Sequence, residues 1–155
     1  MTPQEFQKLL APVAEHMRGK ALDKGLEAEL NTSFPADGPA FKAIEQACHA
    51  AIAAGWMCNR EAGGIRFGRV VKPDGSLAEC SVDVVEMENV KGPHHRHPNG
   101  EVDMIMPVSP TAKFDGHGAG WLVYGPGSAH HPTVSDGKAL VLYLLPGGAI
   151  EFTKT

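Results

Sequence analysis

The chain has 155 residues, of which 43% are hydrophobic and 21% are charged, a composition typical of a folded globular protein. Its net charge of -4 gives no basic surface for nucleic acid, and no apolar run is long enough to span a membrane. The first residues do not have the pattern of a signal peptide, and the three cysteines include no Cys-x-x-Cys pair. We therefore expect a cytoplasmic protein with reduced thiols and a single domain over residues 1–155.

The first third of the chain, residues 1–55, has the pattern of about three helices. Thr2 and Glu5 have the spacing of a capping box, and Asp37 is placed to cap the third helix. The expected helices cover residues at about 3–18, 22–31 and 38–54. Because their apolar residues recur at helical spacing, we expect this helical segment to pack on the rest of the chain.

From residue 56 the pattern changes to short apolar runs separated by turn sequences rich in glycine and proline. The expected strands are Met57–Glu61, Ile65–Val71, Glu79–Glu88, Glu101–Pro107, Trp121–Tyr124, Ala139–Leu145 and Ala149–Thr153. Asp136-Gly137 is one of the turn signals between them. Seven or eight strands without intervening helices predict an antiparallel sandwich or barrel over residues 56–155.

A histidine-rich segment, His94–Glu101, contains the strongest chemical signal. His95 and His97 are two residues apart, so their imidazoles lie on one face of an extended strand. Pro98-Asn99-Gly100 favours a turn that returns Glu101 to the same face. Two neutral ring nitrogens and one carboxylate are suitable ligands for a divalent metal ion.

A second histidine pair follows the glycine turn Gly125-Pro126-Gly127. His130 and His131 are neighbours, so on a strand only one of them can face the metal. The spacing from Gly127 favours His130, and His131 is the alternative fourth ligand.

The pattern His95-x-His97-x-x-x-Glu101 resembles the first cupin motif, and Gly127-x-x-His130 resembles the second. In cupins these four side chains bind one metal ion inside a small double-stranded β-barrel, or jelly roll. The resemblance implies a mainly β, cupin-like barrel preceded by about three N-terminal helices, with these four residues as metal ligands. The ligand set suits iron, manganese, zinc, cobalt or nickel alike. Cupins are often dimers, so we also expect a homodimer.

Five segments are similar to the 4-hydroxylaminobenzoate lyase family. They are Gly55–Cys58, Gly63–Arg69, His94–Glu101, Gly118–His130 and Leu144–Phe152. That family converts 4-hydroxylaminobenzoate to 3,4-dihydroxybenzoate (protocatechuate) and ammonia in bacterial nitrobenzoate breakdown. The resemblance implies a small aromatic acid as substrate, and no organic cofactor because the reaction is redox-neutral overall. The expected catalytic residues are the metal ligands themselves, Glu101, His95, His97 and His130.

An aromatic acid requires a cation for its carboxylate and an apolar surface for its ring. Arg66 and Arg69 lie three apart on an expected strand and so face opposite sides, and one of them is expected to bind the carboxylate. Trp121 and Tyr124 are the expected walls for the ring. Two alternatives to a lyase remain: a metal-dependent cupin oxygenase acting on an aromatic substrate, and a non-enzymatic cupin that binds a small acid.

Overall fold

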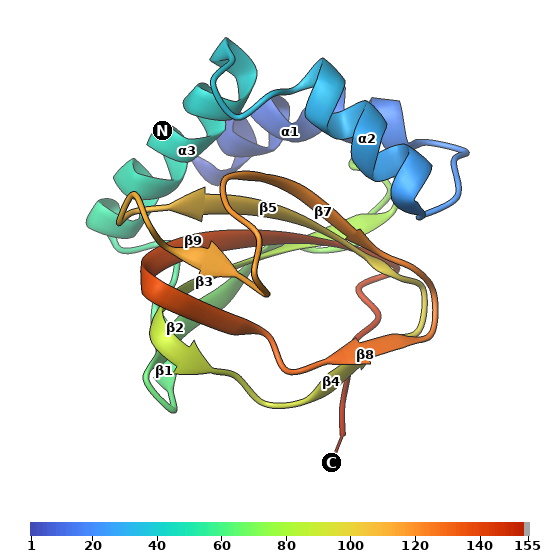
Figure 1. Ribbon diagram of the computed structural model, residues 1–155. Coiled ribbons are helices and arrows are strands. Elements are labelled where there is room, and N and C mark those ends of the chain that lie inside the picture. Colours follow the sequence, from blue (N-terminus) through green and yellow to red (C-terminus); the bar gives the residue numbers. More distant parts are fainter. Residues whose placement is uncertain (154–155) are drawn as a thin grey trace.

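The computed structural model describes residues 1–153, and its helices lie in the first third of the chain (Figure 1). They are α1 (Pro3–Met17), α2 (Lys24–Ser33) and α3 (Pro39–Ala54). The expected capping box begins α1: Thr2 Oγ1 accepts from the Glu5 N–H, and the Glu5 side chain accepts from the Thr2 N–H, both at 3.1 Å. Among these residues, no helix is both long enough and apolar enough to cross a membrane.

The third helix differs from the prediction at its first residue. Gly38, rather than Asp37, is the N-cap of α3, and no side chain caps this helix. Pro39 at the first helical position has no N–H that needs a partner, and the Gly38 N–H donates to the Pro35 carbonyl at 2.8 Å. Gly55 ends α3 in the left-handed conformation, with a φ of 89°, as expected for a C-terminal glycine.

Strands form most of the remainder of the described chain. They are β1 (Arg60–Ala62), β2 (Ile65–Val71), β3 (Cys80–Lys91), β4 (His95–His97), β5 (Glu101–Pro107), β6 (Lys113–Phe114), β7 (Gly120–Tyr124), β8 (Ser128–His130), β9 (Thr133–Pro146) and β10 (Glu151–Phe152). The observed bounds of β2 and β5 equal the expected ones, whereas β3 and β9 extend further than the sequence indicates.

The sequence Asp136-Gly137 does not reverse the chain, although its residues favour a turn. It lies inside β9, where the register against β3 shifts between Glu88 and Val90. Asp136 and Gly137 have φ values of 60° and 136°, and the Gly137 N–H donates to Asn89 Oδ1 at 3.1 Å. The turn-forming residues therefore make a β-bulge within one long strand.

The strands form two antiparallel sheets. The larger has the order β1-β2-β3-β9-β5-β7, with β6 paired to β9, and the smaller has the order β10-β4-β8. In Figure 1 the three helices cover one face of the larger sheet, and β4 and β8 lie across from its other face. The expected mainly β, cupin-like fold behind three N-terminal helices is confirmed.

Strand alternation gives the larger sheet two different faces, because successive side chains point to opposite sides. The outer face packs against the helices and is formed by Val82, Val84, Val102, Met104, Trp121, Val123, Leu140, Leu142 and Leu144. The inner face is formed by Val85, Met87, Ile105, Leu122, Ala139, Val141, Tyr143 and Leu145. Glu101 and Asp103 of β5 alternate with Val102 and Met104 and therefore also lie on the inner side.

Candidate metal and active site

Strand β4 presents two buried imidazoles to the interior. His95 and His97 are 2% and 0% exposed, whereas Arg96 between them pairs with Glu151 at 2.9 Å on the outside. Strand β8 pairs with β4 in a register that places His130 opposite His95. The pairing of these two short strands therefore brings the two histidine motifs together.

Two glycines allow the chain to turn closely around this site. Gly100 has a φ of 85°, and a Cβ at this position would lie 2.8 Å from the carbonyl oxygen of Tyr124. Gly127 has a φ of 82°, and its N–H donates to the His97 carbonyl at 2.7 Å. Because the chain turns at Gly100, β5 begins directly with Glu101, whose carboxylate faces the two imidazoles.

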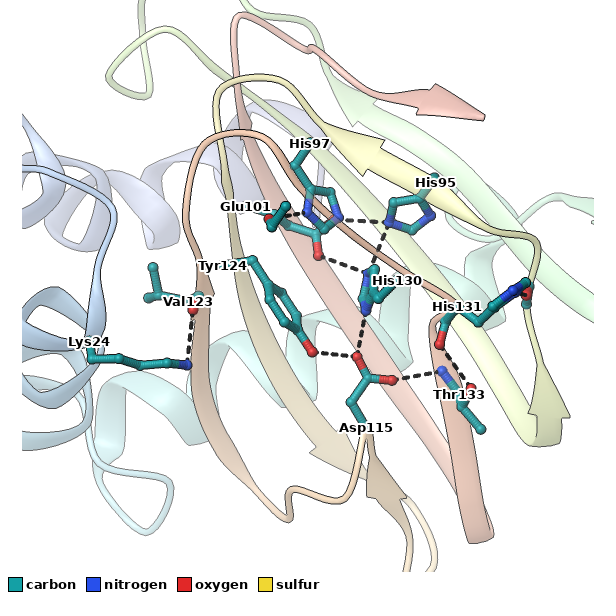
Figure 2. A network of polar contacts seen from close by, with 12 residues as sticks. Lys24, His95, His97, Glu101, Asp115, Val123, Tyr124, His130, His131 and Thr133 are labelled. Carbon is teal, nitrogen blue, oxygen red and sulfur yellow. Dashed lines mark hydrogen bonds and ion pairs between the residues drawn. The ribbon is translucent and has the colours of Figure 1, made fainter. Parts of the chain in front are cut away.

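Figure 2 shows the four expected ligands, His95, His97, Glu101 and His130, whose ligand atoms all lie within 4.8 Å of one another. His95 Nε2 is 3.0 Å from His130 Nε2 and 3.7 Å from Glu101 Oε1. His97 Nε2 is 3.2 Å from Glu101 Oε1, and His130 Nε2 is 3.8 Å from Glu101 Oε2. The structure thus gathers these four side chains into one cluster.

Asp115 determines which nitrogen of His130 faces the cluster. Its Oδ2 lies 2.6 Å from His130 Nδ1 and accepts from the Tyr124 hydroxyl at 2.6 Å, and its Oδ1 accepts from the Thr133 N–H at 2.9 Å. Burial raises the pKa of Asp115, but the hydrogen bonds from His130 and Tyr124 outweigh it, and the pKa lies below its ordinary value. An ionised carboxylate only accepts, so His130 Nδ1 carries the proton and Nε2 presents a lone pair to the cluster.

Ser128 fixes the tautomer of His97 in a similar way. The Ser128 hydroxyl donates to the Gly125 carbonyl at 2.6 Å, so it accepts a hydrogen bond from His97 Nδ1, which is 2.9 Å away. His97 Nδ1 therefore carries the proton, and its Nε2 directs a lone pair toward Glu101. Neither Ser128 nor Asp115 was expected from the sequence, where both belong to glycine-containing turns.

The cluster has more hydrogen-bond acceptors than donors. Within residues 1–153, His97 Nε2 and both carboxylate oxygens of Glu101 are buried without a hydrogen-bond partner. Burial raises the pKa of Glu101, but the imidazoles of His95 and His97 beside it outweigh this effect, so the pKa is lowered and the carboxylate is ionised. Buried lone pairs that face a buried carboxylate are unfavourable unless a proton or a cation lies among them. Three imidazoles and one carboxylate suit a divalent transition metal, so these residues fit the expected ion.

A second buried carboxyl group, Asp103, lies two residues beyond Glu101 on β5. Asp103 is 0% exposed, and among the described residues neither of its oxygens has a hydrogen-bond partner. Burial, and then the charge of Glu101, raises the pKa of Asp103 well above its ordinary value, which favours the protonated form of this group. The spacing of two is the signal in the sequence that places Asp103 on the same side of the strand as Glu101.

His131 is not part of the cluster. Its Nδ1 lies 3.1 Å from the Gly92 carbonyl oxygen, and its ring lies against that of His94 with centroids 4.9 Å apart. Neighbouring residues on a strand point to opposite sides, so the orientation of His130 into the cluster turns His131 away. The geometry therefore favours His130 as the fourth ligand.

His95 is one of the residues that line a cavity of about 630 Å³. Its walls are mostly apolar and include Ile65, Phe67, Val85, Met87, Tyr143, Ile150 and Phe152. The charged residues in its walls are Arg60, Arg69 and Asp83. A concave and largely apolar space with a few polar groups is typical of a site for a small molecule.

The two arginines expected to bind the substrate are both engaged in ion pairs. Arg69 lines the cavity, but its guanidinium donates to both carboxylate oxygens of Asp83, at 2.9 and 3.1 Å. Arg66 pairs with Glu86 at 3.3 Å and is not among the described residues that line the cavity. Sequence reasoning did not single out Arg60, which does line it.

The two expected aromatic walls lie on opposite faces of β7. Trp121 is 4% exposed on the outer face, where its ring edge meets Phe34 and Phe41 and its Nε1–H donates to the Phe34 carbonyl at 2.9 Å. Tyr124 faces inward and stacks on His97 with centroids 5.6 Å apart. Neither residue is among the described residues that line the cavity: Trp121 faces the helices, and Tyr124 lies beside His97 and Asp115.

Two antiparallel sheets, with three histidines and one glutamate gathered between them, have the arrangement of a cupin-like fold. A solved structure that resembles it is an RmlC-like cupin protein from Ralstonia eutropha JMP134, with 9% sequence identity and a TM-score of 0.46 over 60% of this chain and 62% of that chain. The model of the 4-hydroxylaminobenzoate lyase family, PnbB, matches residues 8–152. The chain belongs to this family.

Two relatives bear the family's name. A 4-hydroxylaminobenzoate lyase from Nocardioides sp. (strain LMS-CY) is 28% identical over 163 residues, which cover 99% of this chain and 96% of the relative. Another from Pseudomonas putida is 28% identical over 153 residues, which cover 88% of this chain and 87% of the relative. The similarity includes the helices as well as the sheets and is not confined to the histidine motifs.

Proposed function

We propose that this protein is a lyase that converts 4-hydroxylaminobenzoate and water to 3,4-dihydroxybenzoate (protocatechuate) and ammonia, with a divalent metal ion held by the cluster. The observation that carries the proposal is the buried cluster of His95, His97, Glu101 and His130 at a mostly apolar cavity. Membership of the family supports the choice of substrate.

The proposed reaction needs water but no external electron carrier. The N–O and C–N bonds of the substrate break, two C–O bonds form on the ring, and nitrogen leaves as ammonia. One water molecule balances the atoms, and the ring loses the two electrons that reduce the hydroxylamine nitrogen to ammonia. The proposal therefore includes no organic cofactor.

Hydrogen bonds with neighbouring residues orient two histidines of the proposed metal site. Asp115 and Ser128 keep the protons of His130 and His97 on Nδ1, so that the Nε2 lone pairs point inward. Glu101 adds one negative charge, which offsets part of the charge of the ion. When bound, the metal ion would supply Lewis acidity toward a substrate oxygen and a position for water at neutral pH. In this proposal the four ligands are the catalytic residues.

The cavity orients the aromatic ring relative to the cluster. Among the described residues that line the cavity, His95 is the one that also belongs to the cluster, so a ring held there lies beside the metal site. Phe67, Met87 and Ile150 supply apolar walls that exclude water from the faces of the ring.

An anaerobic assay tests the proposed reaction. Purified protein loaded with a divalent metal should convert 4-hydroxylaminobenzoate to equal amounts of ammonia and 3,4-dihydroxybenzoate with oxygen excluded. Liquid chromatography measures the acid, and a coupled enzymatic assay measures the ammonia. Oxygen consumption in step with product would instead indicate a metal-dependent oxygenase. Tight binding of benzoates without turnover would indicate a non-enzymatic cupin that binds a small acid.

The expected homodimer and the cytoplasmic location stay predictions. Light scattering on the purified protein measures the first, because a homodimer has twice the 16.5 kDa mass of the chain. A mass equal to that of one chain would contradict it.

A further inference from the structure

One positive charge in the cavity wall has no balancing group among the residues that the structure describes. Arg69 and Asp83 neutralise each other through two contacts, at 2.9 and 3.1 Å, and Arg69 also donates to the Gly148 carbonyl at 3.3 Å. Arg60 lines the same cavity and, within residues 1–153, has no hydrogen-bond or ion-pair partner. The cavity therefore has a net positive charge located at Arg60.

Arg60 and His95 border this cavity from different sheets. Arg60 lies on β1 at the edge of the larger sheet, in register with Phe67 of β2, and His95 lies on β4 of the smaller sheet. Figure 1 shows β1 and β4 as separate segments on the side of the molecule away from the helices. Most of the other wall residues are apolar, so among the described residues the cavity combines the unpaired Arg60, an apolar body and, at His95, one edge of the cluster.

We propose that Arg60 binds the carboxylate of the aromatic substrate and thereby selects anionic arylhydroxylamines over neutral ones. A planar guanidinium donates two parallel hydrogen bonds to a carboxylate. In a para-substituted acid the hydroxylamino group lies across the ring from the carboxylate, so binding at Arg60 directs it away from β1 and into the cavity. This inference rests on the proposed function, because it takes hydroxylaminobenzoate as the substrate.

The other two arginines of this region do not offer a comparable group. Arg66 and Arg69 would each have to leave an existing ion pair, with Glu86 and Asp83 respectively, to bind a carboxylate. Asp83 would then be left unpaired in a partly buried position, which is unfavourable. Glu86 would keep Lys138 at 3.7 Å, but Arg66 is not among the described residues that line the cavity. Arg60 requires no such exchange, although solvent screens its charge because its side chain is exposed. We therefore expect a moderate contribution to binding.

Steady-state kinetics on two substrates test this role. Arg60→Gln should raise KM for 4-hydroxylaminobenzoate roughly 10-fold with little change in kcat, because a hydrogen bond to a charged group contributes to uniform binding. N-phenylhydroxylamine, which lacks the carboxylate, should react equally well with both proteins. Arg60→Lys should recover part of the loss, since lysine keeps the charge but not the planar fork. Arg18→Gln, which removes an exposed arginine from the helical side, is the matched control and should leave both KM values unchanged.

Equilibrium binding separates this inference from the lyase activity. Calorimetry with 4-hydroxybenzoate and 4-hydroxybenzamide compares a charged and a neutral ligand of nearly equal shape. Arg60→Gln should weaken the benzoate roughly 10-fold and leave the benzamide unchanged. Equal losses for both ligands, or no loss for the benzoate, in a variant with the circular dichroism of the wild type would overturn the role of Arg60. If benzoate binds through Arg60 but 4-hydroxylaminobenzoate is not converted, the proposed function fails while the binding role stands.

Discussion

The outer and inner faces of the larger sheet are built from the same strands, yet they hold different kinds of residue. On β5, Val102 and Met104 pack against the helices, whereas Glu101 and Asp103 face the interior. On β9, Leu142 faces the helices and its neighbours face the other way. Strand alternation thus lets one sheet support an apolar core and a polar site that are separated only by its own thickness.

The two faces also differ in how well their buried groups are satisfied. Most of the buried polar atoms without a hydrogen-bond partner in the described chain belong to His97, Glu101 and Asp103 on the inner side. The outer face buries apolar side chains. Groups left without partners are costly, and a well-packed region elsewhere must offset that cost. We therefore expect substitutions on the inner face to affect function first and substitutions on the outer face to affect stability first.

The largest effect on activity is expected from a substitution within the cluster. His97→Ala should lower kcat/KM at least about 1,000-fold, because the charge stabilisation that a catalytic metal provides is worth several kcal/mol. Arg96→Gln is the matched control: it lies next to His97 on β4 but points outward to Glu151, and it should keep nearly full activity. Undiminished turnover by His97→Ala would show that the cluster is not the active site.

A substitution on the outer face should have the opposite outcome. Leu142→Ala removes buried methyl groups that pack against the helices and should lower the free energy of unfolding by about 2–5 kcal/mol. Denaturant unfolding followed by circular dichroism measures this change. Activity per folded molecule should remain close to that of the wild type. If kcat/KM falls sharply while stability is unchanged, the two faces are not separate in function.

A smaller loss of activity is expected at Asp115, which touches the cluster only through His130. Asp115→Asn keeps the shape of the side chain but can donate as well as accept, so the tautomer of His130 is no longer fixed. Metal affinity, measured by competition with a chromophoric chelator, should fall about 10- to 100-fold. Asp136→Asn, in the exposed bulge of β9, is the control. Equal affinities for the two variants would mean that His130 keeps its orientation without the carboxylate.

The smallest effect concerns the three cysteines, which belong to the apolar core shared by the helices and the outer face. Burial raises the pKa of Cys58 to about 12 and that of Cys80 to about 11, and it also raises the pKa of Cys48. These thiols are therefore protonated at pH 8 and should react with iodoacetamide much more slowly in the native protein than in denaturant. Rapid labelling of the native protein, followed by mass spectrometry, would show that this core opens readily.

The cluster could be predicted well from the sequence because its residues are close together in two short segments. Strand spacing places His95 and His97 on one side, a turn returns Glu101, and a glycine precedes His130. The pairing of β4 with β8, which sets His130 opposite His95, could not be predicted. It depends on backbone hydrogen bonds between segments that are distant in the sequence.

The residues around the substrate were harder to predict. The odd spacing of Trp121 and Tyr124 shows that they face opposite sides of a strand, but the sequence does not show which side holds the cavity. Trp121 faces the helices because it fills a gap between Phe34 and Phe41. No pattern in the sequence distinguishes Arg60 from other arginines. Its proposed role follows from the structure, in which it lines the cavity and has no hydrogen-bond or ion-pair partner within residues 1–153.

Metal analysis tests most directly whether the inner face holds a divalent ion in this cluster. Mass spectrometry of the elements in purified wild-type and Glu101→Gln protein gives the metal content of each. We predict about one divalent ion per chain in the wild type and a loss of that ion in Glu101→Gln, with unchanged circular dichroism. Equal metal content in the two proteins, or full turnover of 4-hydroxylaminobenzoate by metal-free wild-type protein, would contradict this prediction.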